Sequence, residues 1–197
     1  MAIELIKEAF KVEELRGNNE IQALVETEIY LSPTKNNIEE LLWVQGKVEI
    51  LNTKIIKDKL IISGLTRFNL LYKKAEEESK IQTLDTSKEF REELDIIGIN
   101  ENMVSKVKSK IEYIEWELEE TKIQLKALIN IWGEVEEFKT IETIKDIHSK
   151  DNLQTLKEKV KYKEVYGREI SYALIKDVLR IGEDSPEIDE IIKFSIH

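Results

Sequence analysis

The chain has 197 residues, of which 41% are hydrophobic and 36% charged, and its formal net charge is −10. A balance this acidic repels nucleic acid and anionic lipid, so neither is expected as a partner. The absence of cysteine excludes disulfides, thiolate metal sites and cysteine nucleophiles. No run approaches the roughly 18 apolar residues of a membrane helix, and the N-terminus lacks a secretion signal, so a cytoplasmic location is expected.

The first predicted element is a short helix over residues 37–42. Ser32, Pro33 and Thr34 supply cap-like residues ahead of an apolar pair, which is typical of a helix start. A matching phrase at residues 184–186 predicts a second short helix over residues 187–192.

A β-hairpin is predicted next, with arms over residues 44–56 and 60–72 and a turn at residues 57–59. Apolar side chains such as Val48 and Ile62 recur between polar ones along both arms. Gly64 lies inside the second arm, where a glycine indicates a bulge or a close approach of another group.

A longer antiparallel hairpin is predicted from residues 111–118 and 123–135, joined by the polar residues 119–122. Apolar residues fall on every second position of the second arm, which marks a strand with one buried face. Trp116 shares a side with apolar neighbours, and Trp43 lies where the predicted helix meets a strand, so both are expected in the core. Residues 138–163 fit either a helix or a strand.

Long strands with few prolines and short turns predict a mainly β fold with short helices, an α+β arrangement being the alternative. The expected architecture is a set of antiparallel sheets forming a sandwich or a curled sheet.

The chain also shows an internal repeat with a period of 150 residues. In ungapped register Lys7 matches Lys157, Gly17 matches Gly167, and residues 23–25 match residues 173–175. Chance similarity between two Lys/Glu-rich segments is the alternative. The repeat predicts three parts: residues 1–137 as a first complete unit, residues 138–156 as a connector, and residues 157–197 as the truncated start of a second unit.

No pattern for catalysis, cofactor binding or metal binding is found. The glycines form no phosphate-binding loop, and the two histidines, His148 and His197, are too few for a metal cluster. The densest acidic cluster is predicted to be a solvated strand edge rather than an acid–base pair; it comprises Glu112, Glu115, Glu117, Glu119 and Glu120. The expectation is therefore no enzyme, no cofactor and no metal.

The candidate protein-binding residues are Trp132 and Tyr113. Trp132 falls on the polar side of the strand over residues 123–135, and tryptophan is enriched at the energetic centres of interfaces. The alternative, and the more frequent outcome for a large aromatic side chain, is cover by a packed helix or by the partial second repeat.

Several segments resemble the SPOCS domain family in order. Residues 37–50 are similar to its opening phrase and first hydrophobic strand, and residues 59–72 to its second strand with a terminal tyrosine. Residues 111–118 with 122–129 resemble its closing hairpin. Residues 184–191 resemble the opening phrase more closely still, whereas residues 35–37 depart from it by lacking the proline.

The resemblance implies the N-terminal part of a SipL-type clostridial spore coat morphogenetic protein. Such a protein acts as a non-enzymatic scaffold that helps assemble the coat around the forespore through protein–protein contacts, in the mother-cell cytoplasm at the forespore surface or spore coat. Its implied partner is the spore coat ATPase SpoIVA. The LysM domain associated with SpoIVA binding has no counterpart in these residues, so direct binding stays open. Self-assembly as a structural component of the spore surface or of an extracellular layer is the alternative function.

Overall fold

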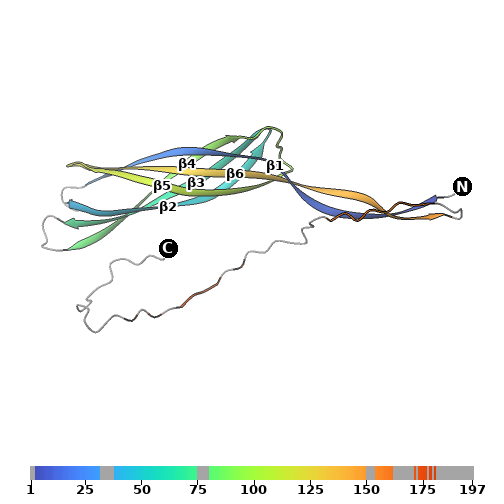
Figure 1. Cartoon of the computed structure of the whole chain (residues 1–197). Coiled ribbons are helices and arrows are strands. Elements are labelled where there is room, and N and C mark those ends of the chain that lie inside the picture. The colour runs from blue at the N-terminus through green and yellow to red at the C-terminus, as the bar shows by residue number, and fades with distance from the viewer. Residues whose placement is uncertain are drawn as a thin grey trace.

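A computed structural model describes residues 3–31, 38–74, 80–149, 154–161, 171, 173–176, 178 and 180. Its elements are six β-strands: β1 (Ile3–Tyr30), β2 (Ile38–Ile56), β3 (Lys59–Lys74), β4 (Ile81–Asp95), β5 (Val104–Leu118) and β6 (Lys122–Ser149). They form two three-stranded antiparallel sheets with the orders β1-β6-β5 and β2-β3-β4 (Figure 1). In the described part of the chain, no helix is long and apolar enough to cross a membrane.

The two sheets pack face to face as an open sandwich, which confirms the predicted mainly β fold. At its two open sides, β2 lies alongside β5 and β4 lies alongside β1. Alternation along each strand sends every second side chain inward. The inward residues of β3 and β6 are the most deeply buried, and the following are at most 1% exposed: Leu60, Ile62, Phe68, Leu70, Ile123, Leu125, Ala127, Ile129, Ile131 and Val135.

The short helix predicted over residues 37–42 is wrong for its described part, because residues 38–42 belong to β2. Register shifts follow Ile38 and Leu41, so one extra residue bulges out at each place. These bulges allow Ile38, Leu41 and Val44 to face the core although they are spaced by three. A spacing of three is also typical of a helix, which explains the error. The helix predicted over residues 187–192 lies outside the described residues.

Both predicted hairpins are confirmed. The β2–β3 turn places Asp58 at φ 60°, in the left-handed region that aspartate tolerates better than most residues. The Asp58 carboxylate accepts a hydrogen bond from the backbone N–H of Gly98 at 2.7 Å. The backbone N–H of Ile96 donates to the carbonyl of Asp58 at 3.0 Å. The turn is thereby held against the connection between β4 and β5.

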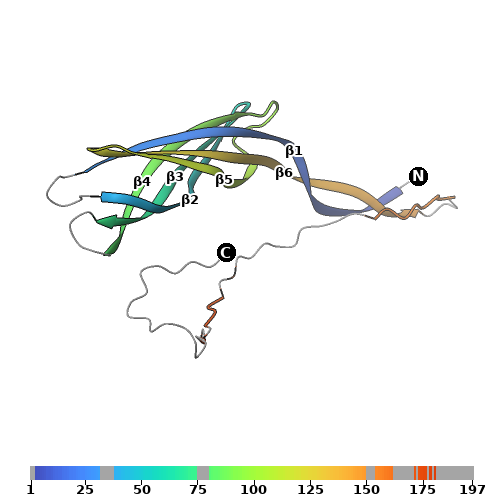
Figure 2. The same cartoon turned by 60° about the vertical axis from the view of Figure 1, so that its left-hand side comes forward.

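The outer halves of β1 and β6 run on beyond the sandwich as a two-stranded ribbon, which we call the arm (residues 3–16 and 137–149; Figures 1 and 2). β5 pairs with β6 only as far as the Val104–Glu136 pair, so beyond it β1 and β6 have no other paired strand in the described part of the chain. Residues 138–149, for which the sequence fitted a helix or a strand, are therefore strand. At about 3.3 Å per residue, the arm extends on the order of 40 Å.

The close approach at Gly64 gives a first prediction. A Cβ added at Gly64 would overlap the ring of Phe90 and lie 2.9 Å from the backbone oxygen of Glu49. Gly64→Ala should therefore lower the free energy of unfolding by about 1–3 kcal/mol, as overpacking of a core does. Phe90→Leu in the same chain should recover part of the loss, as measured by urea unfolding. Equal losses from Gly64→Ala with and without Phe90→Leu would contradict this packing.

The hydroxyl of Thr66 gives a second. Thr66 is 0% exposed, and its Oγ1 has no hydrogen-bond partner among the described residues. Thr66→Val replaces the hydroxyl by a methyl of similar size, so it should raise the free energy of unfolding by about 1 kcal/mol. The matched control Thr66→Ser keeps the hydroxyl and loses the methyl, and should lower it by a similar amount. A lower melting temperature for Thr66→Val would count against this assignment.

Candidate functional site

The two candidate binding residues lie on one surface, the outward side of the β1-β6-β5 sheet, which we call the outer face. Ile129 and Ile131 point inward at 0% exposure, so alternation turns Leu128 and Trp132 outward. Trp132 pairs with Lys108 of β5, and Tyr113 of β5 pairs with Leu128. The structure thus brings Trp132 and Tyr113 to the same face.

A β-bulge is what places Tyr113 there. Strict alternation puts Ile111 and Tyr113 on one side of β5, but the register shifts between them and leaves Glu112 as the extra residue. Ile111 accordingly packs against the core, while Tyr113 is 54% exposed. Glu112 accepts a hydrogen bond from the side-chain amide of Gln22 at 3.0 Å. This bond ties β5 to β1 across the central strand.

Tyr113 ends a short apolar row across all three strands of the outer face. The register sets Leu24 of β1 beside Leu128 of β6, and Leu128 beside Tyr113 of β5. Leu24 is 56% exposed. Sequence reasoning missed Leu24, because residues 23–25 are all apolar and give no alternation to show which of them points outward.

Trp132 lies four residues from Leu128 along β6, roughly 13 Å at ordinary strand spacing. Its cross-strand neighbours are Glu20 of β1 and Lys108 of β5. The ring is partly buried, and within the described residues no second layer packs over this face. The surface therefore presents aromatic and aliphatic side chains beside charges of both signs, a composition that suits protein contact.

The other two tryptophans are not in the buried core, contrary to expectation. Trp116 is on the inward side, level with Leu125, yet it is 45% exposed near the end of β5. Trp43 pairs with Leu71 and is only partly buried. Its position follows from the bulge at Leu42, which shifts the alternation of β2 so that Val44 is buried instead.

The described part of the chain carries hollows that are open to solvent. Its best-defined hollow is open, measures about 250 Å³ and is lined by Glu115, Trp116, Glu117, Gln124 and Lys126. In the same part of the chain, no group of three or more histidine, aspartate or glutamate side chains is placed to hold a metal ion. This geometry is suited to binding a partner over an open surface.

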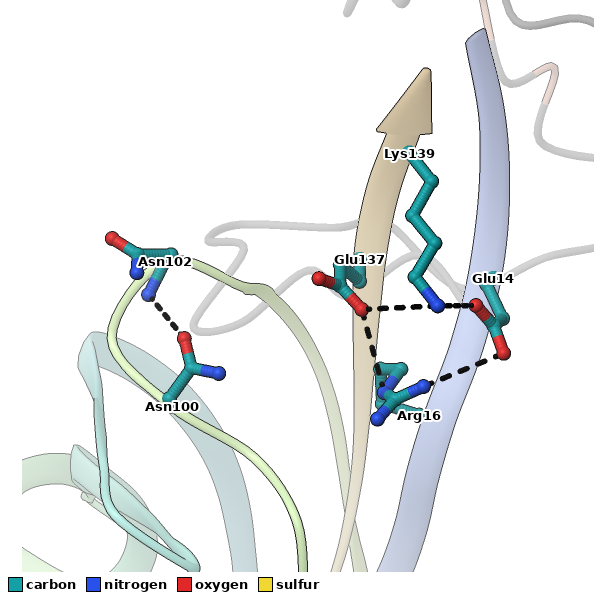
Figure 3. Close-up of polar contacts among 6 residues, drawn as sticks. All are labelled: Glu14, Arg16, Asn100, Asn102, Glu137 and Lys139. Carbon is teal, nitrogen blue, oxygen red and sulfur yellow. Dashed lines mark hydrogen bonds and ion pairs between the residues drawn. The ribbon is translucent and has the colours of Figure 1, made fainter. Parts of the chain in front are cut away.

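Ion pairs on both sides of the ribbon fasten the base of the arm. On one side, Lys106 of β5 contacts both Glu13 of β1 and Glu136 of β6. On the other side, Lys139 and Arg16 each contact both Glu14 and Glu137 (Figure 3). The hydrogen bond and the charge of Lys139 hold the pKa of Glu14 below its usual value.

Acid should therefore loosen the base of the arm. Because its pKa is lower in the folded state, Glu14 contributes stability that is complete above its unfolded pKa and is lost as the pH falls through its folded pKa. Protection of arm amides against hydrogen exchange, corrected for intrinsic rates, should fall as the pH drops below the ordinary glutamate pKa of about 4.3. Lys139→Met should weaken this pH dependence and leave sandwich amides unaffected. Arm protection that stays constant as the pH drops would overturn the expectation.

The comparisons with known proteins bear on residues 37–119, which match the family model described as SipL, SPOCS domain. No curated protein and no solved structure matches the chain. The matched residues extend through β2, β3, β4 and β5, so they include the whole β2-β3-β4 sheet and one edge of the other. The resemblance to this family is confirmed: residues 37–119 carry a SPOCS domain match of the SipL type.

Proposed function

We propose that this chain is a non-enzymatic scaffold in endospore formation that helps assemble the spore coat around the forespore through protein–protein contacts. The observation that carries the proposal is the SipL SPOCS match over residues 37–119, since that family points to a sporulation-related role in protein interaction. The proposed site of action is the mother-cell cytoplasm at the forespore surface or in the coat.

The outer face supports a contact role. Leu24 and Tyr113 are each more than half exposed, and they lie in one row with Leu128 between them. Removing adjacent apolar side chains from water is favourable, so a partner that covers them gains binding free energy. Trp132 adds a side chain of the type that most often dominates interface energies. We propose Trp132 and Tyr113 as the protein-binding residues, with Leu24 and Leu128 as part of the same surface.

The proposed organisation is one complete unit over residues 1–137, a connector over residues 138–156 and the start of a second unit over residues 157–197. β6 itself continues into the connector as far as Ser149. Units in tandem would present the same weak surface repeatedly, and linkage raises the effective concentration of each further contact. This gain in apparent affinity suits assembly of a large shell.

SpoIVA is the partner that the family suggests. These residues include no LysM segment to support direct binding.

A specific observation favours the second candidate, a self-assembling structural component of the spore surface or of an extracellular layer. The arm leaves strand edges without a neighbouring strand in the described residues, and such edges can pair with another chain. An ordered lattice formed by the purified protein would favour this second function over the scaffold.

The scaffold proposal is tested in sporulating cells that carry the intact protein. Deleting the gene should leave coat material detached from the forespore, and normal encasement in the deletion strain would refute the proposal. A Trp132→Ala/Tyr113→Ala chain should reproduce the defect while remaining folded, since removing interface anchors costs about 2 kcal/mol or more, roughly a 30-fold loss of affinity.

The matched control is Leu51→Ala, because Leu51 is 54% exposed, like Tyr113, but lies on the opposite sheet. This control should encase normally. A coat defect of equal size in Leu51→Ala would show that the effect is not specific to the outer face. Circular dichroism of each purified variant establishes that the sandwich is intact.

A further inference from the structure

The arm has a free strand edge on β6. Within the sandwich, this edge of β6 is occupied by β5, and the pairing ends at the Val104–Glu136 pair. From residue 137 to Ser149, the described residues pair β6 only with β1, on its other side. Apolar side chains on both strands of the arm remain largely in contact with water, including Leu5, Leu15, Phe138, Ile141 and Ile144, which are 41–55% exposed. A two-stranded ribbon of this kind is marginal in water, and a third strand would stabilise it.

Residues 154–161 run back toward this ribbon. Lys157 contacts the carboxylate of Asp146 through its Nζ at 2.8 Å. Antiparallel pairing with residues 150–153 as the connecting loop would set Lys157 directly opposite Asp146. The segment forms no strand in the structure. Its apolar side chains Leu156 and Val160 are exposed to solvent, at 95% and 78%.

The same register sets complementary side chains opposite each other at four positions, one of which, Lys145, is the extra residue of a bulge in β6. It sets Glu158 opposite Lys145 and Lys161 opposite Glu142, in addition to Lys157 opposite Asp146. It also sets Leu156 opposite Ile147, an apolar pair. Opposite charges and apolar pairs directly across two strands both stabilise a sheet, whereas like charges destabilise it. A shift of one residue would set Lys157 opposite Lys145.

The internal repeat independently indicates a strand here. Residues 157–161 match residues 7–11, which lie in β1 and pair with β6 in the arm. A segment similar in sequence to part of β1 thus contacts the strand with which β1 pairs. Its alternation of Leu156, Glu158 and Val160 with Lys157, Lys159 and Lys161 also has the period of a strand.

We infer that the free edge of β6 in the arm is a docking site for residues 154–161, the opening strand of the following repeat, which pairs antiparallel with residues 142–149 as a third strand. The connecting loop is short, so the effective concentration favours docking within one chain over docking between chains. Successive repeats are then joined through a shared three-stranded arm. This inference depends on the arm and on the repeat, and it holds whether or not the chain acts in spore formation.

Engineered cysteines test the register, because the natural chain contains no cysteine. Ile147→Cys/Leu156→Cys and His148→Cys/Thr155→Cys each place two thiols directly opposite, on the same side of the bulge at Lys145 and at one pair of each hydrogen-bonding type, within the Cα spacing that a disulfide needs. Under oxidised glutathione, at least one pair should close to an intramolecular disulfide at ten times the rate of an off-register control or faster. The control Ile147→Cys/Val160→Cys sets the thiols about 13 Å out of register.

Charge reversal then tests the ion pair. In the Ile147→Cys/Leu156→Cys chain, Lys157→Glu should slow closure severalfold, and Asp146→Lys with Lys157→Glu should restore it. Disulfides between chains, seen as dimers on a non-reducing gel, would contradict docking within one chain and would instead indicate strand exchange between two copies. Closure no faster than in the off-register control, with no dimers, would refute docking at this edge.

Discussion

The pairing of β6 with two partners at once is the constraint on which the rest of the structure depends. Its inward residues from Ile123 to Val135 form the floor of the core at 0% exposure, and its two edges hold β1 and β5. Gly133 contributes by having no side chain, since a Cβ there would lie 2.7 Å from a methyl of Leu60 and 3.0 Å from one of Leu94. The two sheets can approach closely at this point only because the position is empty.

The region matched by the SPOCS model ends at residue 119, just before β6 begins. The match therefore identifies the strands that carry the family's pattern, whereas the sheet is completed by strands on either side of it. The core requires β1 and β6, although the matched residues do not include these two strands.

Much of this fold could be predicted from local periodicity. The alternation from Ile123 to Val135 and the turn at Asp58 each follow from a single physical rule, strand pleating in one case and tolerance of positive φ in the other. The errors arose where bulges break the period. Ile38 and Leu41 were taken for helix positions, and Ile111 and Tyr113 for one side of a strand, because one extra residue reverses the side to which a strand residue points. A bulge has little local sequence signature, so the shared face of Tyr113 and Trp132 required the register, which only the structure supplies.

The arm has a mechanical consequence. Ile3 and Ser149 are paired at its tip, so both ends of the ribbon lie at the same place. A load that pulls these two ends apart acts on one strand pair at a time and unzips the ribbon. The hydrogen bonds of the sandwich would together resist a shearing load. A load applied at the tip of the arm does not reach them until the arm has opened. While residues 154–161 are undocked, the ribbon would therefore act as an extensible element that yields first and lengthens the molecule while the core stays folded.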